Sequence, residues 1–304
     1  MYITNKRSWF LVISEALILI CVIALLVFGL KPGIEFGSGS ILTISFEGDV
    51  EQTELESAVV ELGYSSAIVQ HTGEGDFIIR TPELSDEEKT SLEASLSDRF
   101  GTATEQGFYS VSPMVASETL HNAIIAVAIA AVGILLYITW AFRKMPKPFH
   151  YGVCAIVALV HDVVVVLGIF AILGAIMNLE INLMFVTGVL AVIGYSINNT
   201  VVVFDRIREN LKKGISVNFE SVVNTSLVET LSRSMNTSLT TMLVVLALLI
   251  FVGSTIQNFA IVLAIGIIAG TYSSLFVAPN LLLIWARGEW GRLILLPQTK
   301  PKEV

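Results

Sequence analysis

Six apolar runs constrain this chain more than any other feature, because each is close to the roughly 20 residues that an α-helix needs to cross a bilayer. The runs lie at about residues 9–30, 119–142, 150–173, 183–205, 234–252 and 259–285. Only 14 % of the residues are charged and the mean hydropathy is +0.76, whereas soluble domains carry about a quarter charged residues. The sequence therefore predicts a multi-pass α-helical membrane protein with six transmembrane helices.

The segment between the first two runs has a different composition. Residues 31–118 hold 17 acidic and 4 basic side chains, whereas the rest of the chain holds 9 acidic and 14 basic ones. This indicates an acidic, water-soluble domain inserted into a membrane protein with basic edges, and it argues against nucleic acid as a partner. The only cysteines, Cys21 and Cys154, lie in apolar runs, so we expect no disulfide framework, no metal site and no cofactor.

Alternating and helical patterns in the inserted segment predict a βαββαβ order, which is the ferredoxin-like α+β arrangement. The expected elements are strands at 41–46, 67–70, 77–80 and 106–112 and helices at 52–62 and 85–100. Ser85 and Glu88 have the spacing of a capping box at the start of the second helix. The segment contains no nucleophile motif, phosphate loop or His/Cys cluster, so we expect no enzyme activity here.

Basic side chains indicate the orientation in the membrane. Six spans place both termini on one side, which carries 14 of the 18 Lys and Arg residues, so the positive-inside rule puts both termini in the cytoplasm. The first run is too long for a cleaved signal peptide and is expected to be an anchor. An amphipathic interfacial helix is expected at 216–232. The expected divisions are 1–30 (cytoplasmic start and first span), 31–118 (extracytoplasmic domain), 119–286 (five further spans) and 287–304 (cytoplasmic tail, disordered at its end).

Polar side chains inside the spans are the functional candidates, because they are costly there. His161 and Asp162 lie near the middle of the third span. Neighbouring residues point about 100° apart on a helix, so we expect these two not to pair with each other. Each then needs a partner on another helix or in a file of water. A role in a proton relay and a structural polar clamp between helices are both open.

Other polar and small residues in or next to the spans are expected to fix helices against one another or at the membrane surface. Asn199 cannot titrate, and a helix–helix hydrogen bond explains it better than catalysis does. Arg233 precedes the fifth span and either extends to the headgroups or turns inward. Gly266 and Gly270 form a GxxxG pattern that predicts close helix packing. An ion-pair cluster is expected at the end of the fourth span, from Asp205, Arg206, Arg208 and Glu209.

Several stretches together resemble the SecF family, whose members work with SecD beside the bacterial Sec protein-export channel. Gly194-Tyr-Ser-Ile197 with Asn198, followed by Phe204-Asp-Arg-Ile-Arg-Glu-Asn210, is similar to the family hallmark. His161-Asp162-Val-Val resembles its second motif. Gly33-Ile-Glu-Phe36, which contains Glu35, resembles a stretch after the first helix and is expected to be a hinge. Tyr195 and Ser196 belong to the hallmark.

The resemblance implies an RND-type membrane subunit that uses the proton-motive force to promote preprotein translocation across the bacterial plasma membrane. The implied partners are SecD, the SecYEG channel, YajC, unfolded preprotein and the lipid bilayer. The family usually has Asp where this chain has Asn199, and its arginine matches Arg233. Because Asn199 cannot carry a proton, coupling would rest on the carboxylate that the family places in SecD, or on Asp162. Glu35 for Asp is a milder change.

Three other functions compete with this one. Half of a small-molecule exporter of RND type would need a second set of six spans from a partner or a second copy. An intramembrane hydrolase would need a nucleophile or metal ligands at the depth of His161 and Asp162. A passive scaffold would tolerate alanine at Asp162 and Arg233 without loss of export.

Overall fold

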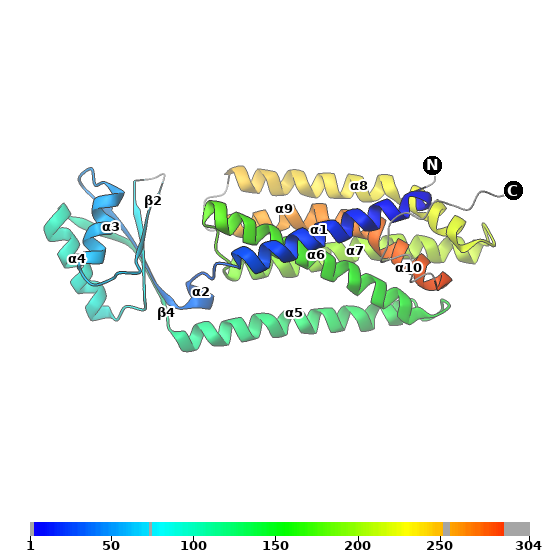
Figure 1. The fold of residues 1–304 in the computed structure, drawn as a ribbon, viewed down its shortest axis with the longest axis horizontal. Coiled ribbons are helices and arrows are strands. Elements are labelled where there is room, and N and C mark those ends of the chain that lie inside the picture. The colour runs from blue at the N-terminus through cyan, green and yellow to red at the C-terminus, as the bar shows by residue number, and fades with distance from the viewer. Residues whose placement is uncertain (1–2, 73–74, 252–255, 289–304) are drawn as a thin grey trace. The chain divides into compact units, whose positions relative to one another are not determined.

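The computed structural model describes residues 3–72, 75–251 and 256–288. They form two compact units, Pro32–Ile125 and Met1–Lys31 with Ala126–Val304. In the described part, six helical segments are long and apolar enough to cross a membrane (Figure 1). This confirms the predicted multi-pass helical membrane protein. The predicted disorder of the tail falls beyond residue 288 and lies outside the described residues.

The unit Pro32–Ile125 contains a four-stranded antiparallel sheet in the order β2-β3-β1-β4. Its elements are α2 (Ile34–Gly37), β1 (Gly39–Phe46), α3 (Gln52–Glu61), β2 (Ile68–His71), β3 (Phe77–Thr81), α4 (Asp86–Phe100) and β4 (Ala103–Val111). From β1 onward this is the predicted βαββαβ order, and β4 begins three residues earlier than expected. Leu42 and Ile79 on the sheet pack with Leu55 on α3 and Leu96 on α4 in one buried core.

Local sequence explains how α4 begins and how the chain enters β1. The Ser85 hydroxyl accepts the Glu88 amide and the Glu88 carboxylate accepts the Ser85 amide, which is the expected capping box. The segment that was expected to be a hinge contains regular structure. Gly33 directly precedes the short helix α2, and Gly39 is the first residue of β1. Gly39 has φ +130°, and a Cβ there would come within 2.7 Å of the Thr81 carbonyl oxygen, so a side chain would not fit.

The membrane unit is built from long helices that pack through small residues. Its elements are the 3₁₀ turn η1 (Thr4–Lys6), α1 (Arg7–Phe28), α5 (Pro113–Ala141, shared with the other unit), α6 (Pro148–Met177), α7 (Leu183–Lys213), α8 (Phe219–Phe251), α9 (Gln257–Tyr272), η3 (Ser273–Val277) and α10 (Ala278–Arg287). A Cβ on Gly266 would lie 2.0 Å from the Val192 side chain, and one on Gly270 would lie 3.0 Å from Ser196. The GxxxG prediction of close packing is confirmed for α9 against α7.

One helix boundary was predicted incorrectly. The interfacial helix at 216–232 and the fifth span are one continuous helix, α8, because Ser, Thr and Arg233 lower the hydropathy of this stretch without breaking helical backbone. The sixth span is one helical segment, Gln257–Arg287, as predicted, but its helix type varies along its length. It changes at Ser273 from α-helix to the five-residue π-helical segment η3 and then to α10. Pro279 lies at the start of α10 and has no N–H to donate, which favours a change in helix type nearby.

Candidate functional site

Asp162 lies at the centre of a buried polar cluster in the membrane unit. It is near the middle of α6, roughly 20 Å from either end at the helical rise, and its side chain is only 1 % exposed. Ser196 on α7 donates its hydroxyl to Asp162 Oδ2 at 2.5 Å, and Ser273 of η3 donates to the same oxygen at 2.7 Å. Three separate segments therefore meet at one carboxyl group.

His161 occupies the other oxygen of this carboxyl group. Its Nδ1 lies 3.0 Å from Asp162 Oδ1, and its side chain is 2 % exposed. The expectation that these neighbours do not pair was wrong, because the flexible side chains of both residues bring their tips together despite the angle between their Cα–Cβ bonds. The imidazole also lies 6.2 Å from the ring of Tyr272, centroid to centroid. In the described chain, His161 Nε2 is buried without a hydrogen-bond partner.

The chemistry available to this cluster is the binding and release of a proton. A buried carboxylate is stable only where donors compensate for lost water, and Asp162 accepts hydrogen bonds from two serine hydroxyls, while His161 Nδ1, which donates only in one tautomer, lies within hydrogen-bond distance. Serine hydroxyls both donate and accept, so they can adapt to either protonation state of the carboxyl group. The cluster therefore has the groups that a proton-binding site needs.

Asn199 and Arg233 are not members of this cluster. Asn199 is on α7 about one helical turn after Ser196 and is 3 % exposed. Its Nδ2 is buried and has no partner among the described residues. Arg233 on α8 is exposed, and no ion pair is found for it within the described ranges. Whether Arg233 extends to the headgroups or turns inward stays a prediction.

The hallmark residues on α7 are partly in polar contacts between helices and partly exposed. Tyr195 donates its hydroxyl to Ser238 on α8 at 2.8 Å, and Ser238 shares a 2.6 Å hydrogen bond with Thr271 on α9. Gly194 and Asn198 are exposed on the same helix. The hallmark thus contributes Ser196 to the Asp162 cluster and Tyr195 to a second polar contact between α7, α8 and α9.

The charged end of α7 forms the expected ion-pair cluster and extends to α8. Asp205 pairs with Arg208, and Arg206 pairs with Glu209 at 2.6 Å. Arg206 also contacts Glu229 of α8 at 2.7 Å. The buried amide of Asn210 donates to the same Glu229 oxygen at 2.7 Å and to Ser226 at 3.0 Å. These contacts fix the end of α7 against α8.

Sequence reasoning missed Ser273 and Glu229. Ser273 lies in the run Thr271-Tyr-Ser-Ser274, and such a group of hydroxyls inside an apolar span is a weak signal of a polar helix face. Glu229 gave no signal, because a single acidic residue on an amphipathic helix is ordinarily solvated.

The hinge motif is in the other unit. There Gly33 is buried, and Glu35 and Phe36 are half-buried on α2.

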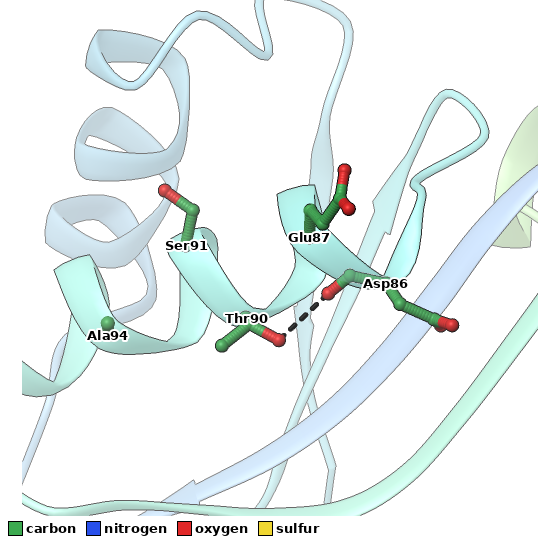
Figure 2. A pocket seen from close by; sticks show the side chains of 5 residues that line it. All are labelled: Asp86, Glu87, Thr90, Ser91 and Ala94. Carbon is green, nitrogen blue, oxygen red and sulfur yellow. Dashed lines mark hydrogen bonds between the residues drawn. The ribbon is translucent and has the colours of Figure 1, made fainter.

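A surface depression lies on α4 of the unit Pro32–Ile125 (Figure 2). It is lined by Asp86, Glu87, Thr90, Ser91 and Ala94, all of them exposed. The Thr90 hydroxyl donates to the Asp86 carbonyl oxygen at 2.8 Å, which is an ordinary bond within a helix. The depression is shallow and its carboxylates face solvent, so we assign it no function.

Comparison with known proteins agrees with the polar motifs. Residues 91–288 match the family "Protein export membrane protein SecD/SecF, C-terminal". The chain is 45 % identical to the protein translocase subunit SecF of Thermobaculum terrenum over 96 % of both chains. It is 36 % identical to the protein translocase subunit SecDF of Bacillus subtilis, over 93 % of this chain and 38 % of that longer protein.

A solved structure shares the fold. The crystal structure of SecDF from Thermus thermophilus, described as a translocon-associated membrane protein, matches with a TM-score of 0.82 and 33 % identity. The match covers 94 % of this chain and 39 % of that one, so this chain spans well under half of the solved SecDF protein. These relatives are translocase subunits, and the small-molecule exporter is accordingly not favoured. The chain belongs to the SecD/SecF family of protein-export membrane proteins, and within it to the SecF proteins.

Proposed function

We propose that this chain acts with a SecD partner in the Sec translocase and uses the proton-motive force to promote preprotein translocation. The observation that carries this proposal is the buried carboxyl group of Asp162, which joins α6, α7 and η3 through hydrogen bonds. Protonation removes the negative charge that these donors stabilise. The most stable arrangement of α6, α7 and η3 therefore differs between the charged and the protonated form of Asp162. Proton binding at Asp162 would thereby drive a helix movement.

Asn199 and Arg233 have a supporting role in this proposal. Asn199 has no proton to exchange, and the hydrogen bonds found for Asp162 among the described residues involve His161, Ser196 and Ser273, not Arg233. We place the proton on Asp162 of this chain, with Asn199 and Arg233 tuning a carboxylate that the SecD partner supplies. The chain itself performs no covalent chemistry. In hydrolases that use Ser, His and Asp, the His lies between the other two, whereas here Asp162 lies between Ser196 and His161.

The proposed topology places both termini in the cytoplasm of a bacterial cell and residues 31–118 outside the plasma membrane. The strand order β2-β3-β1-β4 with all pairs antiparallel supports a ferredoxin-like domain there. This domain would contact unfolded preprotein leaving the SecYEG channel, with YajC as a further partner. It would move about the segment Gly33–Ser40. An unchanged export rate after the domain is cross-linked to the membrane helices would contradict that movement.

The test is the export rate of a preprotein into vesicles that contain this chain, its SecD partner and SecYEG, with and without an imposed proton gradient. We expect the gradient to accelerate export with the natural chain and to have no effect with Asp162→Asn. Asp205→Asn is the matched control, because Asp205 is an exposed carboxylate on α7, and it should leave the response intact. A full response with Asp162→Asn would contradict the proposal. Asn199→Asp then shows whether a second carboxyl group adds to the response.

A further inference from the structure

The π-helical segment η3 begins at Ser273, directly beside the proposed proton site. The Ala278 amide donates to the Ser273 carbonyl oxygen five residues earlier, which is the π-helical pattern. Pro279 follows at the start of α10 and cannot donate the hydrogen bond that an uninterrupted α-helix would require. Single π-helical turns within α-helices are frequent at functional sites. In this chain, the turn coincides with the residue that contacts Asp162.

The hydroxyl of Ser273 has two acceptors within reach. It donates to Asp162 Oδ2 at 2.7 Å and lies 3.3 Å from the Gly270 carbonyl oxygen of α9. The next residue, Ser274, is equally buried but donates to the Thr271 carbonyl oxygen at 3.1 Å. The segment therefore offers two adjacent buried serines, of which one contacts the carboxyl group and the other provides a matched control.

We infer that Ser273 is a positioning residue for the proton on Asp162, and that its hydroxyl switches acceptor when the carboxyl group is protonated. With Asp162 charged, Ser273 donates to Oδ2. When a proton binds Oδ2 and forms an O–H bond, that oxygen becomes a donor, and the Ser273 hydroxyl turns to Gly270. The contact that holds η3 to α6 is thereby exchanged for one within the α9–η3 helix. This inference rests on the proposed function, because it assumes that Asp162 takes up a proton.

Few other titratable groups face this carboxyl group. His161 contacts it from α6 itself. Tyr272 of α9 lies beyond the imidazole, and its own hydroxyl donates to the Phe10 carbonyl oxygen at 2.6 Å. On α1, the Cys21 thiol is directed to the Val165 carbonyl oxygen. The charged side chains of α7 and α10 are near the ends of those helices, so the donors nearest to Asp162 other than His161 are the two serine hydroxyls.

The experiment uses the full chain in lipid bilayers and infrared difference spectra between acid and alkaline pH. The protonated carboxyl band that Asp162→Asn abolishes reports the proton on Asp162, and its pH midpoint is measured in each variant. Ser273→Ala removes a donor that stabilises the charged form, so we expect the midpoint to rise by about one pH unit, a tenfold change in proton affinity. Ser273→Thr, which keeps the hydroxyl, and Ser274→Ala should both stay close to the natural midpoint.

Each outcome has a separate meaning. An unchanged midpoint in Ser273→Ala contradicts this inference and leaves the proposed proton site standing. A band that persists in Asp162→Asn contradicts the proposed proton site and with it this inference. An equal shift in Ser274→Ala shows a general loss of helix packing and also contradicts the assignment. If Ser273→Ala does not fold, Ser273→Cys retains a weaker donor, and a smaller rise of the midpoint is then expected.

Discussion

Two groups of charged and polar side chains involve α7 and differ in their access to water: the Asp162 cluster, to which α7 contributes Ser196, and the charged cluster at the end of α7. The Asp162 cluster is almost fully buried and contains one carboxyl group with hydroxyl and imidazole partners. The cluster at the end of α7 contains several opposite charges, from Asp205 to Glu209, and is partly exposed. In water an ion pair gains little, whereas inside the membrane each hydrogen bond to a charge matters more. Burial, and not the number of charges, should therefore decide which cluster controls function.

The largest difference between the two clusters should appear when one carboxylate in each is neutralised. Asp162→Asn should reduce the acceleration of export by a proton gradient by a factor of at least about 10, the equivalent of about 1.4 kcal/mol. Glu209→Gln removes exposed ion pairs to Arg206 and Lys213 and should change the same ratio less than twofold. Both are measured as export rates in vesicles that contain the SecD partner. Equal losses in the two variants would remove the distinction between the clusters.

The packing that holds Ser196 in place should give the next effect. A Cβ on Gly266 would lie 2.0 Å from the side chain of Val192 on α7, one helical turn from Ser196. Gly266→Ala should therefore destabilise the membrane unit by about 1–3 kcal/mol, since the helices must separate. The control is Gly133→Ala, because a Cβ there meets no atom of the described chain within 4 Å. Unfolding in detergent by increasing amounts of SDS measures both, and equal stability of the two variants would contradict the close packing.

The exposed cluster should respond more weakly and should depend on salt. Arg208→Gln removes the pair with Asp205 and the contact of its guanidinium with the Phe142 ring. We expect a loss of about 0.2–1 kcal/mol that becomes smaller at high ionic strength. The same SDS unfolding at low and high salt tests this. A loss above 2 kcal/mol that salt does not change would show that this cluster behaves as a buried one.

The smallest effect concerns an exposed carboxylate outside the membrane unit. Hydrogen bonds from the Ser85 amide and hydroxyl lower the pKa of Glu88 below its ordinary value. A carboxyl group with a lowered folded-state pKa stabilises the fold above its unfolded-state pKa, and this stabilisation is lost as the pH falls through the folded-state pKa. The protection of the amides at the start of α4, measured as hydrogen exchange relative to the intrinsic rate at each pH, should therefore fall in acid, and Glu88→Gln should weaken this pH dependence. An identical pH profile in Glu88→Gln would exclude the capping box as its cause.

The sequence alone was sufficient to predict the structural elements that follow from residue periodicity and spacing. Six apolar runs, the βαββαβ order and the capping box at Ser85 follow from periodicity and spacing, and the structure contains them. Asp162 was also identified correctly as a buried polar residue, because an ionisable group in an apolar run is conspicuous. Its membership of a proton pathway stays a prediction.

The parts that depend on three-dimensional packing could not be predicted. Ser196 and Ser273 are small, are tolerated in any apolar helix and are separated from Asp162 by 34 and 111 residues. The pairing of His161 with Asp162 depends on side-chain rotamers, which the helical spacing alone does not determine. The π-helical turn in the last span was not predicted, because Pro279 restricts the hydrogen bonds nearby without determining which helix type replaces them.

The packing of Val192 against Gly266 also has a consequence for how the protein opens. The Val192 side chain fills the space that a Cβ on Gly266 would need, so α7 cannot slide past α9 without moving this side chain out of its place. We expect α7 and α9 to open as one cooperative unit, with shared protection of their amides over hours of deuterium exchange. Backbone amides near Gly266 and Val192 would then exchange slowly, and the helices that pack outside α7 and α9 would open first.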